Sequence, residues 1–221
     1  MTRVAPLEAA RPAAVEFLTS DDVVVRGELR GRPGRWVILV HDEGEDLDAW
    51  RPLYPPLSGL CDCVLAFDLR GHGASGDPWD PSSIQLDVAA AREFALQRQA
   101  AKVIVIGAGI GASAALLAAG TAAVDGLIQL SPRAALAGAS PSDLRRSRAP
   151  KLIVAGSRDG DALAAAQEVH RLVVGWSSLV TPPVAEQGVA LLTSDWGGHV
   201  REAIQSFLRD YLSVVAVAGR R

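Results

Sequence analysis

The chain has 221 residues and a formal net charge of −3 at pH 7, and hydrophobic residues make up 49% of it. This length and apolar content suit one α/β domain with a sizeable core, so we expect a single domain over residues 1–221. The cationic residues form no block, which argues against a nucleic-acid-binding face. No apolar run reaches the roughly 20 residues of a membrane span, so we also expect no membrane association.

The two cysteines and the N-terminal region indicate a cellular compartment. Cys61 and Cys63 lie too close in sequence for a disulfide within one strand, and no second Cys or His pair stands nearby to complete a metal site. Glu8 and Arg11 fall where a secretory signal would need an unbroken apolar stretch. These features favour a reduced, cytoplasmic protein with no metal and no cofactor.

The first 34 residues predict an antiparallel hairpin, with strands at 15–18 and 23–29, a turn at 20–22 and a Gly- and Pro-containing break at 30–34. Beyond that break, short apolar β-rich runs alternate with helical stretches. The predicted strands are residues 36–40, 64–67, 103–106, 127–130, 152–154 and 189–193. Continuous apolar runs of this length are typical of strands buried on both faces of a parallel sheet.

The stretch after residue 83 predicts a helix, because Ile84, Val88, Ala91 and Ala95 recur at helical spacing. Alternating strands and helices favour a doubly wound sheet, whose functional site lies at the C-terminal ends of its strands. The loops that follow the predicted strands are therefore the place to look for chemistry.

The loops after these strands carry motifs in a consistent order. His41 ends the strand at 36–40, and the run Asp68-Leu69-Arg70-Gly71-His72-Gly73 follows the next strand. Gly107-Ala108-Gly109-Ile110-Gly111 follows the strand at 103–106 and opens an Ala-rich helix, the context of a nucleophile elbow. Asp159 follows the strand at 152–154, and His199 follows the run at 189–193.

This order of motifs resembles that of the α/β-hydrolase family over almost the whole chain. The resemblance implies an α/β-hydrolase fold with a doubly wound, mostly parallel sheet and an N-terminal antiparallel hairpin. Larger members insert a helical lid where this chain has only residues 131–151, so we expect no cap domain and an open site. The motif at residues 68–73 is expected to be a structural turn, with His72 outside the catalytic site.

By the same resemblance, Asp159 and His199 stand at the positions of the catalytic acid and histidine, and Gly109 stands where the family has its serine nucleophile. Glycine has no side chain to attack a carbonyl carbon. Loss of the nucleophile in a serine protease lowers turnover by about 10⁶. Ser113 is the nearest hydroxyl, and we interpret it as a packing residue of the helix rather than a substitute nucleophile.

The oxyanion site is expected to consist of the backbone amides of Glu43 and Ile110. The family places a glycine after the strand-end histidine, whereas here His41 is followed by Asp42. A carboxylate about 4 Å from a developing oxyanion opposes it by roughly 4 kcal/mol at an effective dielectric of about 20. Two other interpretations of this acidic segment are a solvated loop and a calcium site. The carboxylates in question are those of Asp42, Glu43, Glu45, Asp46 and Asp48.

The glycines at the elbow also match the dinucleotide-binding pattern G-x-G-x-x-A over residues 107–112. That pattern requires an acidic residue at the end of the next strand, about 20 residues further on. The next predicted strand ends instead in Ser131-Pro132, which disfavours nucleotide binding.

Three functional hypotheses follow. The first is a hydrolase-like protein without a serine nucleophile that is non-catalytic and binds a small ester-like molecule or a protein partner. The second is an enzyme in which His199, oriented by Asp159, activates water or a substrate proton directly. The third is an ordinary esterase in which residue 109 has been engineered from serine to glycine.

Overall fold

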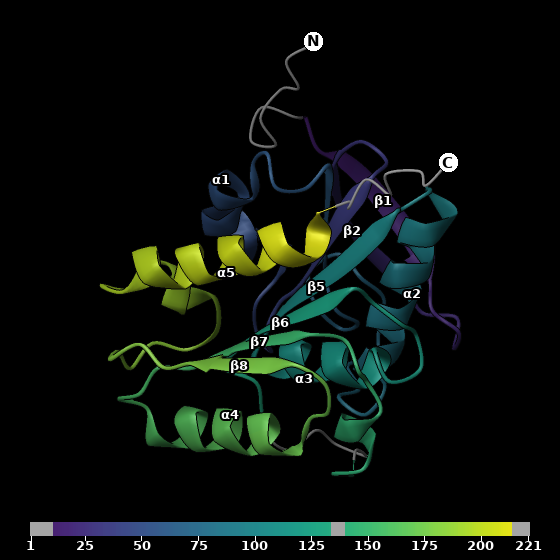
Figure 1. The fold of residues 1–221 in the computed structure, drawn as a ribbon. Coiled ribbons are helices and arrows are strands. Elements are labelled where there is room, and N and C mark those ends of the chain that lie inside the picture. Colours follow the sequence, from purple (N-terminus) through teal and green to yellow (C-terminus); the bar gives the residue numbers. More distant parts are fainter. Residues whose placement is uncertain (1–10, 134–139, 214–221) are drawn as a thin grey trace, which may run out of the picture.

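The computed structural model describes residues 11–133 and 140–213. Its eight strands form one sheet in the order β1-β2-β4-β3-β5-β6-β7-β8 (Figure 1). β2 pairs antiparallel with both β1 and β4, and the other neighbouring strands are parallel. The strands are β1 (Ala13–Leu18), β2 (Val24–Gly31), β3 (Arg35–Val40), β4 (Cys63–Phe67), β5 (Lys102–Ala108), β6 (Gly126–Leu130), β7 (Lys151–Val154) and β8 (Ser177–Val180).

The N-terminal hairpin is confirmed, and its turn has a local cause. Asp22 adopts a left-handed backbone conformation (φ 64°), which Asp tolerates better than most residues. The Thr19 hydroxyl accepts a hydrogen bond from the Val23 amide at 2.9 Å and closes the turn. The expected mostly parallel, doubly wound sheet with an antiparallel hairpin is therefore present.

Helices cover both faces of this sheet (Figure 1). Successive residues of β3 alternate between the two apolar layers, with Trp36, Ile38 and Val40 in one and Val37 and Leu39 in the other. The first layer is completed by α2 (Ile84–Gln97), α3 (Gly109–Ala118) and α4 (Gly160–Leu172), together with the 3-10 turn η2 (Asp143–Arg145). The second is completed by η1 (Leu47–Leu53), α1 (Tyr54–Leu57), η3 (Gly188–Leu192) and α5 (Gly197–Leu212).

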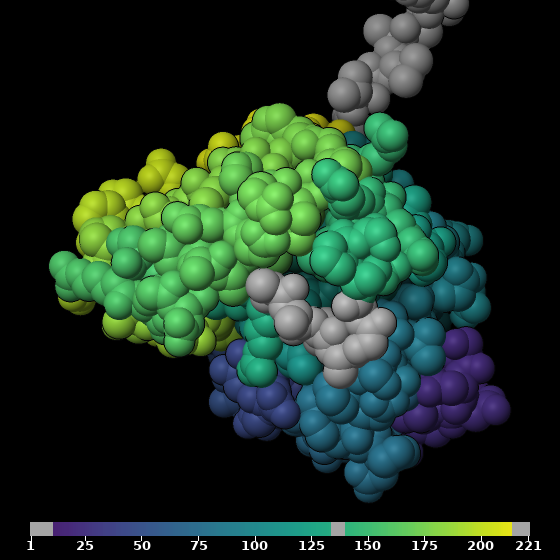
Figure 2. Space-filling view, turned by 90° about the horizontal axis from the view of Figure 1, so that it is seen from below, coloured from purple at the N-terminus to yellow at the C-terminus, as the bar shows by residue number. Residues whose placement is uncertain are grey.

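The predicted helical stripe is confirmed, because Ile84, Val88, Ala91 and Ala95 are all buried on α2. Figure 2 shows the face that carries α4, with the N-terminal hairpin at the other end of the molecule. In the segment expected to lack a cap domain, the described residues form only the turn η2, and residues 134–139 lie outside the described part.

The strand predicted at residues 189–193 is wrong. Residues 189–192 belong to the 3-10 helix η3 and residue 193 is its C-cap, and Val189, Leu191 and Leu192 pack in the second apolar layer. A short buried apolar run has no periodicity that distinguishes strand from helix. The last strand is β8, which the sequence hides because it begins with two serines and is only half-buried at the edge of the sheet.

Cys61 and Cys63 are buried thiols, and burial raises the pKa of each to about 12. Within residues 11–133 and 140–213, no helix has both the length and the apolar content needed to cross a membrane.

Candidate functional site

The elbow is formed where β5 meets α3. Gly109, the first residue of α3, has a left-handed backbone (φ 51°), a conformation that costs residues with a Cβ atom. A Cβ added to Gly111 would lie 2.3 Å from the carbonyl oxygen of His41, so the beginning of α3 packs directly against the end of β3. The glycines thus bring the Ile110 amide close to the loop that follows β3.

The Asp42 carboxylate occupies the position that the sequence assigns to a substrate oxyanion. Its Oδ1 accepts hydrogen bonds from the Glu43 amide and from the Ile110 amide, each at 2.8 Å. These are the two amides expected to form the oxyanion site, and both point at this one acceptor. A Cβ atom at residue 109 would lie 1.9 Å from Asp42 Cγ, so the carboxylate also fills the space that a side chain at residue 109 would take.

Arg133 holds this carboxylate from the other side. Its guanidinium lies 3.2 Å from Asp42 Oδ1 and 3.3 Å from Glu43 Oε2. The buried Ser113 fixes the backbone of Arg133, since its hydroxyl donates to the Arg133 carbonyl at 2.8 Å and accepts from the Arg133 amide at 3.0 Å. Ser113 therefore positions Arg133, and this agrees with its interpretation as a packing residue.

Two histidines shape the loop after β3. His41 is fully buried, with Nδ1 2.7 Å from the Asp42 carbonyl and Nε2 accepting from the Leu69 amide at 2.9 Å. These partners place its proton on Nδ1, and burial lowers its pKa, so the ring is neutral. His72 Nε2 accepts from the Gly44 amide at 3.1 Å, so His72 supports the loop, in line with the structural role expected for it.

Other acidic groups of this loop are committed to backbone amides. Asp46 accepts from the Asp48 amide at 2.9 Å and caps η1, and Glu45 lies 3.3 Å from the Asp42 amide. Burial raises the pKa of Glu45. Among the residues that the structure describes, no three His, Cys, Asp or Glu side chains are grouped so as to hold a metal ion. The loop is therefore neither wholly solvated nor arranged as a cation cage.

Asp159 is engaged in local structure. It is the N-cap of α4, and its Oδ1 accepts from the amides of Asp161 and Ala162 at 3.1 and 2.9 Å. Its Oδ2 accepts a hydrogen bond from the Gln187 side chain. The hydrogen bonds from Ala162 and Gln187 hold the pKa of Asp159 below its usual range.

His199 lies in the first turn of α5, after η3 rather than after a strand, and it is exposed. Its ring stacks on that of Trp196 at a centroid distance of 4.7 Å. In the described part of the chain no hydrogen bond joins His199 to Asp159. The structure thus brings Gly109, Glu43 and Ile110 together around Asp42, and it leaves the acid and the histidine in separate local contacts.

Sequence reasoning missed that the Asp42 side chain itself fills the amide site, and it missed Arg133 altogether. One signal was available for Asp42: an acidic residue after the strand-end histidine accompanies a glycine at the elbow. Arg133 had no such signal, because its role depends on a backbone contact with Ser113, 20 residues earlier.

Comparison with known proteins agrees with this fold. Residues 37–219 match the model of the alpha/beta hydrolase family. An esterase of Pyrococcus furiosus, Pf2001, superposes with a TM-score of 0.80 at 18% identity, over 96% of this chain and 98% of that one. Dienelactone hydrolase from Anabaena variabilis superposes with a TM-score of 0.73 at 19% identity, over 92% and 99% of the two chains.

A third solved structure, DcsB in complex with its substrate analogue, superposes with a TM-score of 0.77 at 14% identity, over 91% of this chain and 100% of that one. No curated protein matches the sequence. At these identities the solved structures establish the fold alone, whereas the family model spans most of the chain. This chain belongs to the alpha/beta hydrolase family.

Proposed function

We propose that this chain no longer performs serine-based acyl transfer and acts as a non-catalytic, binding member of its family. The observation that carries the proposal is the position of the Asp42 carboxylate. It accepts hydrogen bonds from the Glu43 and Ile110 amides at 2.8 Å and lies against Gly109. An incoming carbonyl oxygen would compete with an acceptor that is already tethered there. The ligand of such a protein is a small ester-like molecule or a protein partner.

Each step of acyl transfer lacks its usual support here. Attack needs a nucleophile, and Gly109 has no side chain. Stabilisation of a tetrahedral intermediate needs amides aimed at the oxyanion, and removal of one such donor alone costs about 10²–10³ in turnover. General-base catalysis needs an oriented imidazole, whereas His199 stacks on Trp196 and Asp159 caps α4.

The test is hydrolysis of p-nitrophenyl acetate by the wild type, His199→Ala and a control variant, His170→Ala. His170 lies within α4 and bonds Ser177 at 3.0 Å, so its removal changes no group of the site. We expect the same low rate from all three proteins. A clear wild-type rate that His199→Ala abolishes and His170→Ala preserves contradicts the proposal.

A nucleophile-free enzyme is the second candidate, in which His199 with Asp159 activates water. The observation in its favour is that His199 is exposed and, among the described residues, donates and accepts no hydrogen bond. It predicts a His199-dependent rate with no acyl-enzyme detectable by mass spectrometry, because water rather than a side chain attacks.

The third candidate, an engineered Ser→Gly change, predicts that Gly109→Ser alone restores hydrolysis. The Asp42 carboxylate argues against it, because it stands where the new side chain would begin. Reading the codon for residue 109 in the source gene distinguishes a native glycine from an engineered one.

A further inference from the structure

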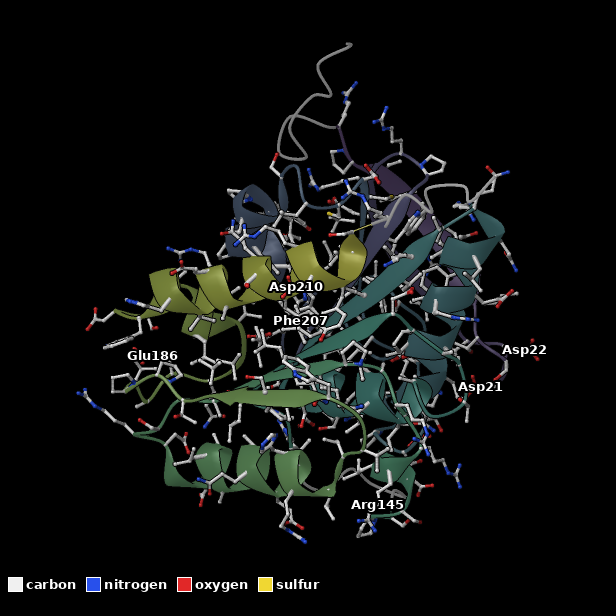
Figure 3. All side chains as sticks on the ribbon, in the orientation of Figure 1. Asp21, Asp22, Arg145, Glu186, Phe207 and Asp210 are labelled. Atoms are coloured by element: carbon white, nitrogen blue, oxygen red, sulfur yellow. The ribbon has the colours of Figure 1, made fainter. Side chains whose placement is uncertain are left out.

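A hollow of about 220 Å³ lies beyond the ends of β7 and β8. The charged and aromatic residues that line it are Arg158, Glu186, Asp195 and Trp196, and residues 183–185 form the rest of its wall. Figure 3 labels Glu186 at this end of the sheet, toward which β7 and β8 point and where α5 begins. Ligands of open α/β sheets bind outside the C-terminal ends of the strands, so the hollow lies where this architecture places binding sites.

The hollow is built on fixed backbone. The Ser157 amide donates to the Pro182 carbonyl at 2.8 Å, and the Arg158 amide donates to the Val184 carbonyl at 2.9 Å. These bonds join the loop after β7 to the loop after β8, and residues 183–185 of the second loop form the wall. The backbone that carries Arg158 and the wall at residues 183–185 is therefore held by hydrogen bonds between the two loops.

Two features of the lining point to one ligand chemistry. Trp196 is 40% exposed although it is a large aromatic residue, and its ring is supported by stacking on His199. Glu186 and Asp195 contribute two carboxylates against the one guanidinium of Arg158, so the lining has a net negative charge. An aromatic face beside excess carboxylate attracts organic cations through the ring quadrupole and through direct charge attraction.

We propose that this hollow binds a small organic cation of the alkylammonium class, with Trp196 against the cationic head and Asp195 and Glu186 as its counter-charges. The inference does not rest on the proposed function, because no residue of the lining belongs to the elbow or to the amide pair at Glu43 and Ile110. Arg158 carries the same charge as the ligand and therefore weakens its binding.

The experiment compares choline with its uncharged isostere 3,3-dimethyl-1-butanol by calorimetry and by the NMR shift of the Trp196 indole proton. We expect choline to bind more tightly by about 2- to 30-fold, the range given by a cation–π contact. Trp196→Leu and the isosteric Asp195→Asn should each weaken choline binding. Arg158→Gln should strengthen it, since it removes the like charge.

Matched controls lie elsewhere on the surface. Trp176→Phe alters another exposed tryptophan, which is 53% exposed and stacks on Phe207 and Tyr211, and Asp210→Asn removes an exposed carboxylate of α5. Neither should change choline binding. Equal binding of choline and its isostere, or choline binding that survives both Trp196→Leu and Asp195→Asn, overturns the proposal. Ester hydrolysis plays no part in this readout, so its outcome is separate from the test of the proposed function.

Discussion

A Cβ atom at residue 109 would lie 1.9 Å from the carboxylate carbon of Asp42, so a side chain at residue 109 and the Asp42 side chain would occupy the same space. The two departures from the family pattern are therefore one structural change. A side chain at residue 109 requires Asp42 to leave the amide pair, and Asp42 in its present place requires glycine at residue 109. This mutual exclusion can be measured.

Gly109→Ala should destabilise the protein more than Gly59→Ala. Gly59 has a left-handed backbone (φ 80°) with nothing within 4 Å of an added Cβ, so its substitution reports the backbone cost alone, about 1–2 kcal/mol. Gly109→Ala adds the loss of the Asp42 hydrogen bonds, about 1–3 kcal/mol more. Urea unfolding of both variants measures the difference.

The same pair can be tested in a cycle with Asp42→Ala. In that background Gly109→Ala should cost no more than Gly59→Ala does, because the carboxylate that it displaces is gone. We expect a coupling energy of at least about 1 kcal/mol between residues 42 and 109. An additive result would show that Asp42 does not occupy this space in solution.

Serine at residue 109 should become reactive only when Asp42 is also removed. Gly109→Ser alone leaves the amide pair blocked or the loop displaced, whereas Asp42→Gly with Gly109→Ser frees both the space and the two amides. We expect the double variant to form an acyl-enzyme with p-nitrophenyl acetate at least about 10²-fold faster than the single variant, the cost of one lost oxyanion donor. Intact-mass spectrometry measures both rates, and equal rates contradict the role given to Asp42.

The fold was predictable because it depends on patterns formed by residues that are close together in the sequence. The buried strands read as apolar runs, α2 shows helical spacing, and the elbow glycines follow β5 directly. The exceptions have a physical cause. The short apolar run at residues 189–193 would fit a buried strand as well as a buried helix. The edge strand β8 contains too few apolar residues to be recognised as a strand.

For the candidate site, the sequence supports a prediction of backbone groups only. The amides of Glu43 and Ile110 follow from chain position, and both do converge on one acceptor. The identity of that acceptor depends on a rotamer of Asp42 and on a contact with Arg133, across 91 residues of sequence. Side-chain contacts over such separations leave no local pattern, so the pairing of Asp42 with Arg133 could not be deduced from the sequence.

Ser113→Ala should lower stability without affecting reactivity. The Ser113 hydroxyl is buried and bonds both the amide and the carbonyl of Arg133, so its removal takes one hydrogen bond from each of these backbone groups, at about 1–3 kcal/mol. Labelling of the wild type with a fluorophosphonate should be absent, because this hydroxyl is not a nucleophile. Labelling that Ser113→Ala abolishes would instead assign Ser113 a catalytic role.

Lys151 should make stability rise with pH above neutrality. Its side chain is fully buried, and Nζ donates to the carbonyls of Ser147, Ala149 and Val174 at 2.9, 2.6 and 3.1 Å. Burial lowers its pKa from 10.5 to about 8. Between these values the unfolded chain binds more protons than the folded chain, so stability increases as pH rises through this window, and the cost of burying the charge is fully present below pH 8.

Lys151→Met isolates this effect, because the buried thiols of Cys61 and Cys63 titrate equally in both proteins. Their raised pKa values act in the opposite direction, since a folded thiol that stays protonated lowers relative stability as pH rises above 9. Between pH 7 and pH 9, the free energy of unfolding of the wild type should therefore rise by about 1 kcal/mol relative to that of Lys151→Met. Urea unfolding at the two pH values measures the difference in free energy of unfolding between the two proteins. A difference that does not change with pH would mean that Lys151 keeps its proton throughout this range.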